Sequence, residues 1–292
     1  MDPSRPAVSI LLALWAPLPS SHGLAVVQGP DAVHEVLDDA GAGPLDLGAW
    51  LSAARPLARC AAVLPGPELA LPAAAGVREA GEGVLVECGA TAAMAGRRLL
   101  LAPEPAGAGV RWRVEELAVA PEPFDPVQAR RDVHAATERA IGALTELDLA
   151  RERPELADAL TDLVAAVLDP RLVPPSMPPR RRDLLERSLR LGAICELALA
   201  DDGAAVTAGQ AARRRRALEP LAGAARRGVC AATQTWVRPE PGSARPVPKS
   251  AAPPQGRCGP RPSPRPSRPG PAGSTSSSGN PRERTSTREH VT

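Results

Sequence analysis

The chain has 292 residues, with 35 prolines and 25 glycines but one Phe, no Tyr and four Trp. Lysine occurs once, at Lys249, among 35 basic side chains, and the formal net charge is +2. So few aromatic rings argue against base stacking on single-stranded nucleic acid. The apolar run at residues 7–17 is too short for a membrane span, which needs about 20 apolar residues.

The near-neutral total conceals an acidic body and a basic C-terminal third. Residues 1–203 carry a net charge of −10, and residues 204–292 carry +12. Residues 237–292 contain 13 prolines and almost no large apolar side chain, so burial there cannot offset the entropy of ordering. We predict a disordered basic tail. The composition of this tail can also be explained by codon bias without any function, because a GC-rich genome favours codons for Arg, Ala, Pro and Gly.

The N-terminal half alternates between short helices and short strands. A first buried helix is predicted over Ala7–Pro17; its alternative is a signal-peptide core, which would make the protein exported. Helices are also predicted over Asp31–Asp39 and Leu45–Arg59, the latter bent or divided by Pro56. A short helix at Pro72–Glu82 and four strands complete a small mixed unit over residues 1–122. The strands are Cys60–Leu64, Gly83–Cys88, Arg98–Ala102 and Val110–Val114.

The second half is predicted to be helical over residues 123–236. Four helices with short links indicate a bundle-like unit; they span Pro126–Ala150, Pro154–Asp169, Arg181–Ala200 and Thr207–Thr235. We expect Pro220 to kink or split the fourth. In the first, the apolar stripe predicted to be buried consists of Val127, Ala136, Ile141, Leu144 and Leu147. The fold class is therefore α+β: a small mixed sheet with helices, a helical C-terminal half and a disordered Pro/Arg-rich tail at 237–292.

Cysteine spacing indicates reduced thiols. Neighbouring cysteines lie at least 28 residues apart, so no C-x-x-C pair exists for zinc binding or redox exchange. An odd number of cysteines, mostly in apolar runs, favours buried thiols and a cytoplasmic protein. The five are Cys60, Cys88, Cys195, Cys230 and Cys258.

Searches for catalytic and ligand-binding motifs find none. The chain has no phosphate-binding glycine loop and no G-x-S-x-G, and His34 with Glu35 supplies only the first two letters of H-E-x-x-H. The turn at Asp201–Gly203 lacks most oxygen ligands of a calcium loop, so we interpret it as a helix end. The four histidines are scattered and are expected on the surface: His22, His34, His134 and His290. We predict no catalytic, cofactor-binding or metal residue and no cofactor.

The most conspicuous charged run is Arg213–Arg216. Four consecutive helical positions fan through roughly 300°, so at least one of these arginines must face its neighbours rather than solvent. The candidate anion contacts are the four arginines of this run, Arg213, Arg214, Arg215 and Arg216, together with Arg226 and Arg227. A solvated face with internal ion pairs is the alternative. Any nucleic-acid contact here would be electrostatic and salt-sensitive.

Two stretches of the chain resemble an uncharacterised protein family of high-GC Gram-positive bacteria. The first is Leu191–Ala225, with its leucine-rich helix, Asp-Asp-Gly turn and arginine-rich helix. The second is Leu64–Val84, where a Leu-Pro-x-Pro strand exit precedes the Glu-Ala-Gly-Glu stretch at residues 79–82. The resemblance would cover most of residues 7–235 and implies no activity, cofactor or catalytic residue.

Three functional hypotheses remain. The main one is a non-catalytic structural or interaction protein with an unidentified protein partner. The second is a nucleic-acid-associated protein that uses the basic C-terminal third. The third is an enzyme without a recognisable motif, whose residues come from distant segments; its candidates are Arg111, Arg113, Glu115 and His134.

Overall fold

The structure is a computed structural model that describes most of the first 236 residues. Contacts divide the chain into residues 1–243 and residues 244–292, and every described residue belongs to the first unit. The described ranges are 6–29, 33–37, 43–67, 75–119, 121–146, 161, 167–200 and 207–236. The tail predicted at 237–292 and most of the helix predicted at Pro154–Asp169 lie outside them. The predicted boundary between residues 122 and 123 stays a prediction.

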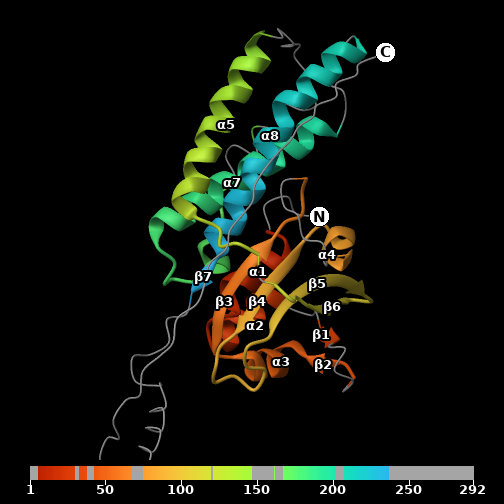
Figure 1. The fold of residues 1–292 in the computed structure, drawn as a ribbon, viewed down its shortest axis with the longest axis vertical. Helices are drawn as coiled ribbons and strands as arrows, with labels where there is room; N and C mark the ends of the chain where they lie inside the picture. Colours follow the sequence, from red (N-terminus) through yellow and green to blue (C-terminus); the bar gives the residue numbers. More distant parts are fainter. Residues whose placement is uncertain are drawn as a thin grey trace, which may run out of the picture. The chain divides into compact units, whose positions relative to one another are not determined.

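Six strands of a seven-stranded sheet lie in the half that was predicted to be mixed, and the seventh comes from the end of the half predicted to be helical (Figure 1). Its order is β2-β1-β6-β5-β4-β3-β7. The pairing of β1 with β6 is parallel and the other pairings are antiparallel, which confirms the α+β class. The strands are β1 (His34–Leu37), β2 (Leu45–Asp46), β3 (Leu57–Val63), β4 (Gly83–Cys88), β5 (Arg98–Ala106), β6 (Gly109–Glu116) and β7 (Thr235–Trp236).

The two faces of the sheet bury different amounts of apolar surface. Alternate residues of β4, β5 and β6 form the main core with helices α1 (Val8–Trp15) and α8 (Ala208–Thr233). The other face carries a smaller cluster, which includes Leu85 and Leu100, next to helix α4 (Ala75–Ala80). Residues 10–16 are buried, so the prediction of a buried first helix is confirmed. Two further short helices are α2 (Ser21–Gln28) and α3 (Leu47–Ala54).

Three long helices make up the described part of the C-terminal half. They are α5 (Pro126–Glu146), α7 (Pro179–Leu199) and α8, and they lie side by side (Figure 1). A 3₁₀ turn at Pro170–Leu172 precedes α7. A capping box between Thr207 and Gln210 starts α8. Within the described residues, no helix is both long and apolar enough to cross a membrane.

Helix α8 continues through Pro220, so of the two predicted outcomes, a kink or a split, the split is wrong. Leu218 and Leu221, on either side of Pro220, are both buried. Their burial on both sides of Pro220 stabilises the continuous helix despite the missing backbone donor.

Helix α5 buries a different face from the predicted one. Its buried residues are Ala129, Val133, Ala136 and Ala140. Two members of the predicted stripe, Val127 and Ile141, are 55% and 60% exposed. Small side chains face α8 because the helices approach closely: a Cβ added to Gly228 of α8 would lie 3.2 Å from Val133 Cγ2. Of the predicted stripe only Ala136 is fully buried, and Leu147 lies outside the described residues.

The predicted helix at Asp31–Asp39 is wrong, because residues 34–37 form β1. His34 and Val36 point into the core and pair with β6, and His34 is 1% exposed rather than on the surface. A segment this short satisfies both helical and strand periodicity, and the available partner strand decides. Similarly, α3 ends before Pro56 and residues 57–59 belong to β3, because proline disfavours helix at the residue before it. The short strands β2 and β7 were not predicted.

Candidate functional site

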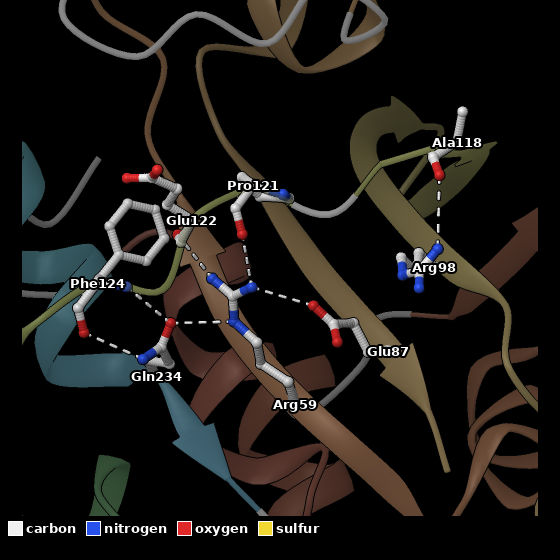
Figure 2. A network of polar contacts seen from close by, with 8 residues as sticks. All are labelled: Arg59, Glu87, Arg98, Ala118, Pro121, Glu122, Phe124 and Gln234. Atoms are coloured by element: carbon white, nitrogen blue, oxygen red, sulfur yellow. Dashed lines mark hydrogen bonds and ion pairs between the residues drawn. The ribbon is translucent and has the colours of Figure 1, made fainter. Parts of the chain in front are cut away.

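A buried polar cluster surrounds Arg59 on β3, which is 2% exposed (Figure 2). Its Nε donates to Gln234 Oε1 at 3.0 Å. Its Nη1 donates to Glu87 Oε1 at 3.0 Å and to the Pro121 carbonyl at 2.8 Å, and its Nη2 donates to the Glu122 carbonyl at 3.0 Å. Four acceptors from three other parts of the chain therefore satisfy this one buried cation, as burial of a charge requires.

Gln234 extends the cluster to the start of the helical half. It lies between α8 and β7, and its side-chain amide accepts from the Phe124 N–H and donates to the Phe124 carbonyl, both at 3.0 Å. Residues 121–124 link the sheet to α5. The cluster thus holds β3, residues 121–124 and the end of α8 together by hydrogen bonds, which is a structural role.

Two further arginines also donate hydrogen bonds to backbone carbonyls. Arg55 donates to the carbonyls of Ala16 and Leu18, at 2.9 and 2.7 Å, just beyond the end of α1. Arg181 Nε donates to the Ala232 carbonyl at 3.1 Å, in the last turn of α8. Desolvation lowers the pKa of both guanidinium groups, but they remain charged at neutral pH and suit the acceptor ends of helices.

A pocket of about 330 Å³ lies where α1, the turn between α4 and β4, and helices α7 and α8 meet. This volume falls at the lower end of the range of small-molecule sites. Much of its wall is apolar and includes Ile10, Leu64, Leu189, Ala193 and Val229. The polar side chains on it are Glu82, Glu186, Ser188, Arg190, Glu196 and Arg226.

One of these carboxylates is already engaged by helix α1. Glu82 Oε2 accepts from the Ser9 N–H at 2.9 Å and from the Ser9 hydroxyl. The residue that precedes α1, Ala7, has no side chain that could cap the helix. Glu82 therefore caps α1 from another part of the chain, where the positive end of the helix favours a carboxylate.

Two buried thiols have pKa values that make them poor nucleophiles. Desolvation raises the pKa of Cys60 to about 12, an effect that Arg55 slightly opposes. Desolvation, aided by Glu196 and opposed by Arg226, raises the pKa of Cys195 to about 11. Since the thiolate is the reactive form, both side chains are inert thiols at neutral pH. Cys88 and Cys230 are also free and buried.

The predicted anion contacts are spread along α8. Arg213, Arg215 and Arg216 are exposed, whereas Arg214 is half-buried, as the fan of four consecutive positions predicts. Arg213 Nε and Arg216 Nε lie 3.4 and 3.3 Å from carbonyl oxygens one turn earlier in α8. Arg226 and Arg227, both half-buried, lie at least about 15 Å farther along the helix axis than Arg216. The six do not converge on one point.

Of the four residues proposed for a motif-free enzyme, three lie on one face of β6 and the fourth lies on α5. On the outer face of β6, Arg111 Nη2 lies 3.9 Å from Glu35 Oε2, and Arg113 forms an ion pair with Glu104. Glu115 accepts from the Gly76 N–H in α4. The fourth candidate, His134, is exposed on α5 beside Glu138, at 3.3 Å.

Other features predicted from the sequence lie outside the described residues. These are the Asp201–Gly203 turn and, in the tail, Cys258 and His290. Among the residues that are described, no group of three or more His, Cys, Asp or Glu side chains could hold a metal ion.

Sequence reasoning missed both Arg59 and Gln234. A signal for the first was present, because an arginine interrupts the apolar strand Leu57–Val63, where a buried charge requires a partner. The sequence around Arg59 does not indicate which groups accept its hydrogen bonds, because Gln234 lies 175 residues away and two of the other acceptors are backbone carbonyls.

Comparison with known proteins gives one match. The family described as Rv1486c-like protein, C-terminal domain, matches residues 127–230, which run from the start of α5 to the last turn of α8. This family is uncharacterised. No curated protein and no solved structure matches the chain.

Proposed function

We propose that this protein is a non-catalytic structural or interaction protein. The observation that supports it is that arginines hold separate segments of the fold together: the buried Arg59 and the half-buried Arg55 and Arg181 all donate to backbone carbonyls. The thiols of Cys60 and Cys195 are held in their unreactive form. In this proposal the polar side chains of the interior serve to build the fold, and function lies on the surface.

The test combines a turnover assay with a search for a defined complex. The full-length protein is incubated with p-nitrophenyl esters, phosphates and glycosides, and it is co-expressed with the products of the genes that neighbour its own. We expect no saturable turnover, and we expect co-elution with one of these products at fixed stoichiometry in size-exclusion chromatography with light scattering. Saturable turnover that is lost when a pocket residue such as Arg226 is replaced would overturn the proposal and revive the enzyme hypothesis.

The second candidate is a nucleic-acid-associated protein that uses α8. Six arginines and a single glutamate, Glu219, occupy this helix, and no acidic residue lies in its first turn. The side chains of Arg213, Arg215 and Arg216 are exposed, and surface arginines in this number fit a phosphate backbone. This candidate predicts retention on duplex DNA that falls steeply with salt.

Two variants separate the contribution of α8 to DNA binding from that of the tail. Replacing Arg213, Arg215 and Arg216 with glutamine should lower the slope of log affinity against log salt by up to about 3, whereas removal of residues 237–292 tests the tail. No salt-dependent retention of the full-length protein would end this candidate.

Two finer proposals concern the family and the location, and the match to an uncharacterised family supports the first. The first is that the relationship extends beyond residues 127–230 to most of residues 7–235, within a family of high-GC Gram-positive bacteria. The second is a cytoplasmic location, which the free thiols and the burial of α1 in the core support. Fractionation of cells that express the tagged full-length protein tests the location; recovery of a chain shortened by removal of residues 7–17 outside the cell would contradict it.

A further inference from the structure

We infer that Pro103 and Pro105 prevent a second copy of this chain from adding its own β5 to an open edge of the sheet. This goes beyond the proposed function, because it identifies a contact that the protein avoids rather than one that it makes. Three observations carry the inference. Strand β5 extends past its neighbour β4, the two prolines occupy positions that face the open edge, and an apolar run lies directly beside them.

The open edge is the part of β5 that lies beyond the beginning of β4. The pairing of these two strands ends with Val84 opposite Leu101, and β4 begins one residue earlier, at Gly83. On its other side, β5 stays paired with β6 as far as Ala106. Among the described residues, no strand pairs with residues 103–106 on the β4 side. This stretch is therefore an edge, although β5 as a whole lies inside the sheet.

The hydrogen-bonding register places both prolines toward this edge. Between antiparallel neighbours, successive residues of a strand bond alternately to the strand on one side and to the strand on the other. The Leu117 N–H donates to the Arg98 carbonyl, so even-numbered residues of β5 bond to β6. The Cys88 N–H donates to the Arg97 carbonyl, so odd-numbered residues bond to β4. Both prolines are odd-numbered, and an N–H at either position would face the open side.

An edge without backbone donors is a poor template for another strand. An added strand pairs with both the N–H and the C=O groups of its neighbour, and proline supplies no N–H. The buried apolar run Leu99–Ala102 lies immediately before the edge. Apolar runs of this kind promote pairing between copies, and residues that interrupt pairing often flank them. A second copy is the expected partner, because the same edge from two copies can pair antiparallel about a two-fold axis.

Other described edges of the sheet are protected in different ways. The outermost strands, β2 and β7, have two residues each, and short edge strands offer few groups for pairing. Beyond the end of β7, the Ala62 N–H of β3 donates to Thr233 Oγ1 of α8 at 3.0 Å, so a side chain takes the place of a neighbouring strand. The prolines protect the open part of β5 in a third way, by removing the donors.

Restoring the two donors tests the inference. The double variant Pro103→Val with Pro105→Thr places strand-forming residues that carry an N–H at both positions. In sedimentation velocity, we expect this variant to self-associate at concentrations at least about tenfold below those that the unmodified full-length chain requires. Pro175→Thr is the matched control, because Pro175 is exposed in the turn before α7 and lies outside the sheet; it should leave self-association unchanged.

Hydrogen exchange locates the contact. The backbone amides that the double variant gains at residues 103 and 105 should exchange more slowly as the protein concentration rises, because they then bond to the second copy. Circular dichroism checks that the variant is folded; if it is not, Pro105→Thr alone carries the test, since Pro105 is exposed. Self-association equal to that of the unmodified chain would overturn the inference and show that proline is only tolerated at these positions. Fast exchange of the new amides in the associated protein, or an equal effect of Pro175→Thr, would also overturn it.

Discussion

The sheet half and the helical half of this protein are packed with side chains of different sizes. Of the twelve largest fully buried side chains among the described residues, Leu185 alone comes from α5, α7 or α8. The others, including Trp50 and Trp112, belong to the sheet, to α1 and α3, or to the segments beside them. In the helical half fewer large side chains are fully buried, and much of the contact is made by alanines and by Gly228, which lies against Ser188 and Val133.

This difference shows how the two halves can be stabilised by distinct means. Large apolar side chains stabilise the sheet half by the area they remove from water. Small side chains let helix axes approach closely, so backbone and Cβ atoms provide the contact through dispersion. The Arg59 cluster, which includes Glu87 and Gln234, lies where the halves join. Substitutions in the two halves should therefore lower the free energy of unfolding through different mechanisms.

The largest effect is expected at the junction. Arg59→Leu removes the donor for Gln234 Oε1 and for two backbone carbonyls, and it leaves Glu87 without its partner. Breaking a buried charged network by removing one partner costs about 3–5 kcal/mol, which urea unfolding would measure. Arg98→Leu is the control, since Arg98 is exposed and makes one 3.4 Å contact with the Ala118 carbonyl (Figure 2). It should change the free energy of unfolding by no more than about 0.5 kcal/mol. Equal losses in the two variants would refute a special role for the cluster.

The second effect is expected at the helix crossing. Gly228→Ala places a methyl group 2.1 Å from Ser188 Oγ, and overpacking of this kind costs about 1–3 kcal/mol. Ser188→Ala in the same chain should recover part of the loss, because the nearest remaining atoms lie 3.1 and 3.2 Å away. Gly142→Ala, where nothing lies within 4 Å, should instead gain up to about 1 kcal/mol from helix propensity. Additive effects of the first two substitutions would show that the crossing is looser than described.

The same contrast explains what could be predicted from the sequence. The strands β4 and β5 were found as short apolar runs with Gly or Pro close by, and β6 because large residues alternate along it; the fold class followed. The positions of α5, α7 and α8 were also found, but not the buried face of α5. Pattern reading searches for large apolar residues, and close packing through Ala129, Ala136 and Ala140 leaves no such pattern.

The candidate sites were less accessible to sequence reasoning. Arg213–Arg216 is visible as a run, and its exposure was expected. The pocket, by contrast, brings together Ile10, Glu82, Ser188 and Arg226, which lie in four separate segments. No local motif can reveal such a site, because the contacts that form it are long-range.

A third prediction uses the absence of tyrosine and the single lysine. Few side chains other than cysteine titrate just above pH 9 in this chain. The pKa of Cys60 is raised from 9.0 to about 12 and that of Cys195 to about 11. The native state therefore keeps these protons where the unfolded chain releases them, so stability is retained below pH 9 and falls as pH rises above it. The slope approaches about 1.4 kcal/mol per pH unit for each thiol.

Urea unfolding at pH 8, 9 and 10 would measure this slope. In Cys60→Ala the loss of stability between pH 9 and pH 10 should be smaller by about 1 kcal/mol than in the unmodified chain. The comparison is between slopes, so the cost of the cavity itself cancels. An unchanged slope in both Cys60→Ala and Cys195→Ala would show that neither thiol keeps its proton in the folded state.

The smallest effect distinguishes the observed face of α5 from the predicted one. Ile141 is 60% exposed, whereas Val133 is 1% exposed and faces Gly228. Ile141→Ala should change the free energy of unfolding by no more than about 0.5 kcal/mol, partly because alanine is the better helix former. Val133→Ala deletes two buried methyl groups and should cost at least about 1 kcal/mol. If Ile141→Ala proved the more costly of the two, the packing of α5 through small residues would be wrong, and the larger apolar stripe would be the buried one.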